Sequence, residues 1–266
     1  MKLRRAFVPR EIKVVLVDGA GTVFDPGSKM PGDAFEKAFT NFGLQVPRPL
    51  IDRHMGKEKM AHVMAILVEP EVKASFRKEF RGEPGDGHAQ IIYGYLKTNL
   101  LLEAEKMAVI PGVFDAVSKL RKMGIKIVMT TGYDRETTEK IFTKFPHLAQ
   151  ILSDSVTSSE VTQGRPAPFM LYRGMELSST YSIEEALNVG DTETDLRTSD
   201  NTCMAGILVT SGITSLTDGL EINRKLGRAH LILPSLVEIA EYILDGTIYE
   251  RIKTAEIENG FRACFV

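Results

Sequence analysis

Short apolar runs alternate with helical patterns along much of the chain. The runs that read as strands each lead into a polar, glycine-bearing loop: Val14–Val17, Ile125–Met129, Ala186–Val189 and Met204–Val209. Helical patterns such as Val113–Lys122 and Glu136–Phe145 lie between them. Apolar runs bounded by turn residues are typical of buried parallel strands, and their alternation with helices predicts a parallel α/β sheet. Ligands of such sheets bind beyond the carboxyl ends of the strands, where these loops fall.

Residues from about 30 to 108 interrupt this alternation with consecutive helical patterns: Asp33–Phe42, Lys57–Val68, Glu71–Phe80 and Gly87–Leu102. In the first of them Phe35, Phe39 and Phe42 share one face. We therefore expect an α/β fold with a Rossmann-like parallel sheet core, residues 1–29 and 109–266, and an inserted helical cap domain, residues 30–108, over the site.

Composition narrows the functional class. The 266 residues are 43% hydrophobic and 26% charged, as in ordinary globular proteins. A net charge of −2 argues against a general nucleic-acid or anionic-membrane role. No stretch approaches the ~20 apolar residues of a membrane helix, and Pro9 and Arg10 interrupt the apolar run that a signal peptide needs. Cys203 and Cys264 lack metal-ligand spacing, which fits a reducing, cytoplasmic compartment; we expect Cys203 to be a small buried hydrophobe.

Carboxylates at the predicted strand ends indicate chemistry on phosphorus. Asp18 follows the first strand, and Asp191 and Asp195 follow a later one, four residues apart. Three converging carboxylates need a cation, and their hard oxygens suit Mg²⁺. Thr131 offers a hydroxyl and Arg165 a fixed positive charge for a transferring phosphoryl group. Together they predict an aspartyl-phosphate site with a carboxylate nucleophile.

This ordered set resembles the four motifs of the haloacid dehalogenase superfamily: Asp18–Thr22, Thr131, Arg165 and Gly190–Asp195. Most phosphatases and mutases of that superfamily carry a second Asp two residues after the nucleophile, which protonates the departing alkoxide and then activates water. Here that position is Ala20, which cannot transfer a proton. Either the protein is catalytically impaired, or its leaving group needs no acid there.

The predicted cap supports the second explanation. Met55-Gly56-Lys57-Glu58-Lys59, followed by His62, resembles the Met-Gly-x-x-Lys cap motif of the phosphonoacetaldehyde hydrolases, in which the lysine forms an imine. The likeness extends over roughly residues 12 to 240 and includes further segments: Asp18–Thr22, Thr130–Tyr133, Gly164–Tyr172 and Val189–Asp195. The resemblance implies hydrolysis of the C–P bond of phosphonoacetaldehyde to acetaldehyde and phosphate, through a Lys59 imine and an Asp18 aspartyl-phosphate.

The chemistry explains why these residues occur together. Cleavage of a C–P bond would expel a carbanion, which is a poor leaving group in water. If Lys59 first condenses with the neighbouring aldehyde, the iminium accepts the electron pair and the group leaves as an enamine. No acid is then needed beside the leaving atom, which accounts for Ala20. The amine must be neutral to attack, so burial and neighbouring positive charge must lower its pKa from ~10.4.

The predicted roles follow from the motifs and the resemblance. The catalytic residues are Asp18, Lys59, His62, Thr131 and Arg165. The substrate-binding residues are Met55, Gly56, Tyr133, Gly21 and Thr22. The Mg²⁺ ligands are Asp18, the backbone carbonyl of Ala20, Asp191 and Asp195. His62 is either a proton shuttle or a packed cap histidine, and Tyr133 lines the site or packs beneath it. The resemblance also implies a small phosphonate substrate and a homodimer formed through the cap.

Three departures from that family leave the exact substrate open. Gly19 stands where a Trp is common, Ser28 lies where a Cys is common nearby, and Lys57-Glu58 replaces apolar residues. A glutamate beside Lys59 would disturb the imine lysine if it pointed inward. Two alternatives therefore stay open: a phosphatase or phosphomutase of the same superfamily acting on phosphate esters, and a non-catalytic protein that binds a phosphate ligand.

Overall fold

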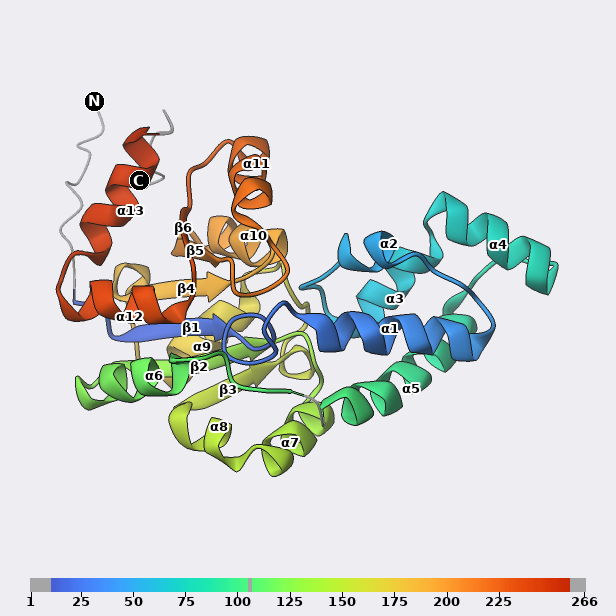
Figure 1. Ribbon diagram of the computed structural model, residues 1–266, viewed down its shortest axis with the longest axis horizontal. Coiled ribbons are helices and arrows are strands. Elements are labelled where there is room, and N and C mark those ends of the chain that lie inside the picture. The colour runs from blue at the N-terminus through green and yellow to red at the C-terminus, as the bar shows by residue number, and fades with distance from the viewer. Residues whose placement is uncertain (1–10, 105–106, 259–266) are drawn as a thin grey trace.

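A six-stranded parallel sheet forms the centre of the larger lobe (Figure 1). The computed structural model describes residues 11–104 and 107–258. The strands lie in the order β3-β2-β1-β4-β5-β6, and every neighbouring pair is parallel. Their bounds are β1 Val14–Asp18, β2 Lys126–Thr131, β3 Asp154–Thr157, β4 Ala186–Gly190, β5 Ala205–Val209 and β6 Leu231–Leu233. The predicted α/β fold with a parallel sheet is confirmed.

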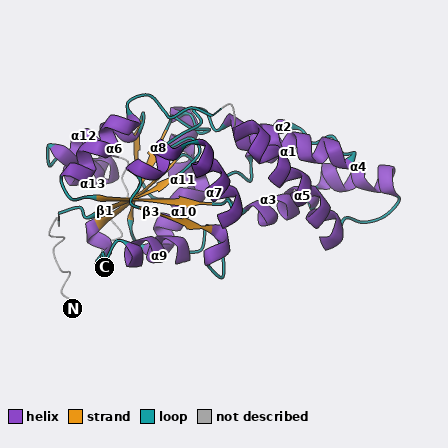
Figure 2. Ribbon diagram, turned by 90° about the horizontal axis from the view of Figure 1, so that it is seen from below, coloured by secondary structure: helices purple, strands orange, loops and turns teal. Residues whose placement is uncertain are grey.

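Helices cover both faces of this sheet, so β1 is buried on both sides. Val15 and Val17 pack into one hydrophobic cluster, while Val14 and Leu16 pack into another on the opposite face. In Figure 2, helices α6, α8 and α12 lie above the strands and α9 lies below. The helices of this lobe are α6 Val113–Lys122, α7 Arg135–Lys144, α8 Pro146–Ile151, α9 Phe169–Leu177, α10 Glu193–Thr202, α11 Leu216–Leu226, α12 Leu236–Leu244 and α13 Ile248–Glu258.

Five helices follow β1 directly and extend beyond the carboxyl ends of the strands, at the right of Figure 1. They are α1 Lys29–Phe42, α2 Arg48–Asp52, α3 Lys59–Leu67, α4 Pro70–Phe80 and α5 Asp86–Glu103. Phe35 and Phe39 of α1 are fully buried, and Phe42 packs partly buried against the same cluster, so the predicted aromatic face forms the centre of this cap. The division of the chain at residues 29/30 and 108/109 stays a prediction.

The first turn of α3 differs from the predicted helix in an informative way. The helix begins at Lys59 and not at Lys57, because Glu58 caps it. The Glu58 carboxylate accepts hydrogen bonds from the backbone N–H groups of Met60 and Ala61, at 2.8 and 2.7 Å. Glu58 therefore binds the helix N-terminus, whose partial positive charge favours a carboxylate.

Two strands and several helices have no counterpart in the sequence prediction. β3 and β6 have four and three residues, too few for a recognisable alternation.

The prediction for Cys203 is wrong: it is exposed, because it occupies the left-handed C-cap position of α10 at the surface. Cys264 and the first ten residues lie outside the described part of the chain. Among the described helices, none has the length and apolar character needed to cross a membrane.

Candidate active site

A pocket lies where β1, β2 and β4 end and the cap loop before α3 meets them. It is lined by Asp18, Ala20, Ser28, Pro31, Met55, Gly56, Lys59, Thr131, Gly132, Tyr133, Arg165, Asp191 and Thr192. The sheet order explains the convergence of the core residues, because β2 and β4 flank β1 and all three strands end at the same edge. Met55, Gly56 and Lys59 of the cap close the pocket from the opposite side.

Three buried carboxylates and one guanidinium lie together on the core side of the pocket; Asp18, Asp191 and Arg165 line it, and Asp195 does not. Asp18, Asp191 and Asp195 each place one carboxylate oxygen within 4.8 Å of the others. Arg165 donates to Asp18 Oδ1 at 2.8 Å and also donates to Asp195 Oδ1. Burial by itself would lower the pKa of the Arg165 guanidinium, but the two carboxylates outweigh it and raise that pKa. Arg165 is therefore a fixed cation beside the Asp18 carboxylate.

The surroundings of Asp191 fit a metal ion. Its Oδ2 accepts hydrogen bonds from Ser28 Oγ at 2.7 Å and from the Ile213 N–H at 2.9 Å. Its Oδ1 is buried and has no hydrogen-bond partner in the described part of the chain. Burial, and then the charges of Asp18 and Asp195, raise the pKa of Asp191 to about 8. Such a cluster is stable as carboxylates only with a cation, and a hard ion such as Mg²⁺ suits an all-oxygen donor set.

Asp195 is held more completely by the protein. Thr192 donates to its Oδ2 through both Oγ1, at 2.6 Å, and the backbone N–H, at 3.1 Å. Its Oδ1 accepts from Arg165. Burial raises the pKa of Asp195, and the Arg165 charge opposes that shift. Direct ligation of the ion by Asp195, and by the Ala20 carbonyl at the pocket wall, stays a prediction.

Lys59 brings a buried amine into this pocket. The residue is 6% exposed, and its Nζ lies 4.9 Å from the centre of the Tyr133 ring and 5.8 Å from that of Phe35. Burial lowers the pKa of the Lys59 amine to about 8; Asp18 opposes this shift and Arg165 adds to it. At this pKa about a tenth of the amine is neutral at pH 7, far more than for an exposed lysine.

The neighbours of Lys59 in the sequence have other roles. The Glu58 carboxylate binds the α3 N-terminus, as described above, and does not line the pocket. Lys57 Nζ lies 3.1 Å from His54 Nδ1, and His54 in turn hydrogen-bonds Glu69 at 2.7 Å. Lys57 therefore belongs to a polar cluster within the cap, while Lys59 faces the core.

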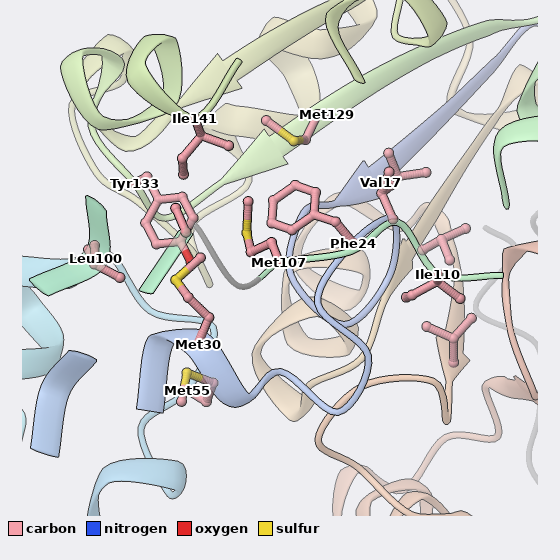
Figure 3. Packing of buried hydrophobic residues seen from close by; sticks show 14 of the residues in the cluster. Val17, Phe24, Met30, Met55, Leu100, Met107, Ile110, Met129, Tyr133 and Ile141 are labelled. Carbon is pink, nitrogen blue, oxygen red and sulfur yellow. The ribbon is translucent and has the colours of Figure 1, made fainter. Parts of the chain in front are cut away.

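Close backbone contacts fix the cap loop on the core. The Lys59 N–H donates to Gly132 O at 3.3 Å, and Thr194 Oγ1 donates to Met55 O at 3.0 Å. Gly56 has a φ of 86°, and a Cβ there would lie 2.4 Å from Thr192 Oγ1. In Figure 3, Met55 and Met30 lie below Tyr133 at this junction. Glycine is therefore required where the two lobes meet.

Thr131 and Tyr133 line the pocket from the loop after β2. Thr131 Oγ1 accepts a hydrogen bond from the Tyr133 N–H at 3.3 Å, so its own proton is available to a ligand. The Tyr133 hydroxyl points at Met30 Sδ, 3.7 Å away. Burial, followed by the charge of Asp25, raises the pKa of Tyr133 well above its usual value, so the phenol stays protonated.

His62 lies behind the pocket and not in its wall. The residue is fully buried, its Nε2 is 2.8 Å from Ile51 O, and its ring centre is 3.9 Å from that of Phe35. Burial, and then the charge of Lys59, hold the pKa of His62 well below its usual range. The imidazole is thus neutral and packed. Its Nδ1 has no hydrogen-bond partner among the described residues, and a proton-transfer role stays a prediction.

Gly21 and Thr22 also do not line the pocket. The Gly21 N–H donates to Phe24 O at 2.7 Å, and with its φ of 80° a Cβ there would lie 2.2 Å from Asp191 Oδ2. Thr22 Oγ1 is buried without a hydrogen-bond partner in the described chain. Both residues shape the loop around the carboxylates, and substrate contact by either of them stays a prediction.

Sequence reasoning missed four pocket residues: Ser28, Pro31, Gly132 and Thr192. Ser28 had a signal, since it was recognised as a departure from the family pattern. Pro31 had no such signal, because its position in the pocket wall depends on the direction in which α1 continues from the loop after β1.

The departure at Gly19 has a packing explanation. A Cβ at Gly19 would lie 2.9 Å from Phe24 Cζ and 3.3 Å from Met129 Sδ. The Phe24 ring lies beside Met129 in Figure 3. Phe24 thus occupies the space into which a larger side chain at position 19 would project.

Comparison with known proteins identifies the family. A family model described as haloacid dehalogenase-like hydrolase matches residues 12–198, and a related model matches residues 162–239. The phosphonoacetaldehyde hydrolase of Paraburkholderia xenovorans is 30% identical over 213 residues, 79% of this chain and 80% of that protein. The phosphonoacetaldehyde hydrolase of Syntrophobacter fumaroxidans is 33% identical over 187 residues, 70% of this chain and 68% of that protein.

Solved structures agree on the fold. A phosphonoacetaldehyde hydrolase-like protein from Oleispira antarctica superposes with a TM-score of 0.82 at 20% identity, covering 96% of this chain and 99% of that one. A putative β-phosphoglucomutase from Bacteroides vulgatus gives a TM-score of 0.69 at 18% identity, covering 91% of both chains. Haloacid dehalogenase-like hydrolases typically use Mg²⁺, which the buried acidic cluster fits. The chain belongs to the haloacid dehalogenase-like hydrolases, and within them to the family of the phosphonoacetaldehyde hydrolases.

Proposed function

We propose that this hydrolase cleaves the C–P bond of phosphonoacetaldehyde to give acetaldehyde and phosphate. One observation carries the proposal: the amine of Lys59, with its pKa lowered to about 8, lines the same pocket as the Asp18 carboxylate. An ester phosphatase needs no buried amine there, but it does need an acid for the leaving oxygen. Ala20 occupies that position on the pocket wall.

The first step joins the aldehyde to Lys59. The neutral amine attacks the carbonyl carbon, and loss of water leaves a C=N bond between Lys59 Nζ and the substrate. Arg165 and the Thr131 hydroxyl hold the phosphonate oxygens, which orients the phosphorus toward Asp18. The aromatic rings of Tyr133 and Phe35 lie beside Nζ and contribute to its burial, which lowers the pKa of the amine.

The second step transfers the phosphoryl group. An Asp18 oxygen attacks phosphorus, the C–P bond breaks, and its electron pair moves to the protonated imine to give an enamine on Lys59. Arg165 stabilises the charge that develops on the phosphoryl oxygens. Mg²⁺ held by Asp18, Asp191, Asp195 and the Ala20 carbonyl would neutralise further charge in this step.

Hydrolysis then restores both residues. Water cleaves the aspartyl-phosphate and releases phosphate, which regenerates the Asp18 carboxylate. Protonation of the enamine carbon and addition of water release acetaldehyde and the free Lys59 amine. The sum is one phosphonoacetaldehyde and one water converted to one acetaldehyde and one phosphate.

A product assay tests the proposal. The purified protein is incubated with Mg²⁺ and either phosphonoacetaldehyde or a panel of phosphate monoesters, and acetaldehyde and free phosphate are measured. We expect equal amounts of both products from phosphonoacetaldehyde and little phosphate from the esters. Phosphate from the esters alone would favour a phosphatase, and no product from any of them would favour a binding protein.

We also propose that two copies pair through the cap. The apolar side chains Ile91, Tyr95 and Leu102 of α5 are 52%, 41% and 58% exposed. Their spacing of four and seven residues places them on one face of the helix, and such a stripe suits a self-complementary contact. Light scattering coupled to size exclusion tests this, with an Ile91→Glu variant expected to be monomeric. A cytoplasmic location likewise stays a prediction.

A further inference from the structure

Two side chains of the cap helix α5 converge on one carboxylate of the core. Tyr93 Oη donates to Asp134 Oδ2 at 2.9 Å, and Lys97 Nζ lies 3.1 Å from the same oxygen. Lys97 Nζ also donates to Glu136 Oε2 at 2.6 Å. We call these four residues the α5–α7 bridge. Tyr93 and Lys97 are four residues apart on α5 and so share a face.

The position of Asp134 makes this bridge more than a surface contact. Its second oxygen, Oδ1, accepts a hydrogen bond from the Thr137 N–H at 2.8 Å and caps α7. Asp134 Oδ1 therefore caps helix α7, and Asp134 Oδ2 binds the two side chains of the cap helix α5. The Asp134 side chain is 19% exposed and that of Lys97 is 30% exposed, so water screens the pair less than a free surface ion pair.

Asp134 also ends the loop that forms one wall of the pocket. Thr131, Gly132 and Tyr133 precede it directly, and all three line the pocket. Gly132 O accepts the hydrogen bond from the Lys59 N–H. The cap thus contacts this loop at two points. The Lys59 N–H donates to Gly132 O, and side chains of α5 contact the Asp134 carboxylate.

We infer that Tyr93 and Lys97 are positioning residues that act through Asp134: they hold α5 against the loop after β2 and thereby keep Lys59 seated against Gly132. Neither of them lines the pocket. Their contribution to catalysis rests on the proposed function, whereas their contribution to the seating of the cap does not.

Two variants separate this role from simple structural loss. Tyr93→Phe removes only the hydroxyl that reaches Asp134. Asp134→Asn keeps an oxygen that can cap α7, since Asn and Asp are comparable N-caps, but it removes the charge that Lys97 contacts. Tyr181→Phe is the control, because it removes a phenol hydroxyl from a position that is 91% exposed and lies outside the pocket, the α5–α7 bridge and the proposed dimer contact.

Hydrogen exchange at the Lys59 amide reports the seating of the cap without requiring any turnover, because its acceptor, Gly132 O, lies in the core. We expect exchange about tenfold faster in Tyr93→Phe and Asp134→Asn than in Tyr181→Phe, as for loss of a hydrogen bond to a charged group. Exchange in β1 should not change. Unchanged exchange at Lys59, or an equal rise in β1, overturns the inference.

A kinetic arm then links the seating to the reaction. With phosphonoacetaldehyde and borohydride, trapping at Lys59 should slow by about tenfold in both variants, while Mg²⁺ affinity measured by calorimetry stays at the wild-type value. Trapping at the wild-type rate in a variant whose Lys59 amide exchanges faster would overturn the positioning role. If the wild-type protein forms no adduct at all, the proposed function fails, and the exchange result still decides the role of the bridge.

Discussion

The reactivity of Lys59 can be predicted in magnitude. Burial lowers the pKa of its amine from 10.5 to about 8. At pH 7 this raises the neutral fraction about 300-fold over that of an ordinary lysine. Because only the neutral amine condenses with an aldehyde, the rate of imine formation should rise about tenfold per pH unit below pH 8 and level off above it.

Two lysines two residues apart provide the test and its control. Lys59→Arg keeps a positive charge but cannot condense with the aldehyde, because the guanidinium stays protonated; trapping should vanish and turnover should fall at least about a thousandfold. Lys57→Arg should stay near wild type, since Lys57 contacts His54 and lies outside the pocket wall.

The assay is reduction by borohydride in the presence of phosphonoacetaldehyde, followed by mass analysis of the peptide that contains Lys59, over pH 6 to 9. The reasoning fails if no adduct forms and Lys59→Arg remains active. The lowered pKa of the Lys59 amine is refuted if the trapping rate rises steadily up to pH 9 without levelling, since that pKa would then be close to the value of an exposed lysine.

Three further predictions concern the core side of the pocket and its contact with the cap loop. Asp18→Asn should abolish turnover and leave the circular dichroism spectrum unchanged, because an amide cannot attack phosphorus. Hydrolysis by this variant at the wild-type rate would exclude Asp18 as the nucleophile. Ser28→Ala should weaken Mg²⁺ binding about tenfold by calorimetry, because the Ser28 hydroxyl orients Asp191 and leaves its Oδ1 for the ion; unchanged affinity would place the ion elsewhere. Gly56→Ala should lower the free energy of unfolding by about 1–3 kcal/mol, because its φ is positive and the new Cβ would meet Thr192 Oγ1; thermal unfolding at the wild-type temperature would contradict this.

The core half of the site was predictable because its geometry follows from the sheet. Asp18, Thr131 and Asp191 each follow a short apolar run, and parallel strands end at a common edge, so three separate motifs had to meet. The prediction needed neither β3 nor β6, which lie at the two edges of the sheet, away from the pocket. Errors in their assignment therefore left the site unaffected.

The cap half of the site was harder to predict from the sequence, because the contacts of its helices join side chains that are far apart in the chain. His62 shares a helical turn with Lys59, and this spacing suggested a shared role. In the structure its ring packs against Phe35 and its Nε2 lies against Ile51 O, and the proton-transfer role stays a prediction. Neither contact has a local sequence signal. The same is true of the bond from Tyr93 to Asp134, which joins residues 41 positions apart.

Glu58 shows how local context can weaken an electrostatic effect that the sequence leads one to expect. A carboxylate beside an imine lysine would favour the protonated amine and oppose condensation. In the structure, Glu58 is engaged by two N–H groups of α3, and it ranks behind burial, Asp18 and Arg165 in its effect on the pKa of Lys59. The capping geometry turns the acid toward the helix N-terminus, where a negative charge is stabilising.

The lowered pKa of Lys59 is a property of the assembled pocket and not of its motif. The groups that determine it come from α1 (Phe35), from the ends of β1 and β2 (Asp18 and Tyr133), and from the loop before α9 (Arg165). A Met-Gly-x-x-Lys sequence supplies the amine, but only a cap seated on the core buries it and places a guanidinium near it. If the cap opened, water would reach the amine and its pKa would return toward 10.5, so imine chemistry at neutral pH requires the closed arrangement.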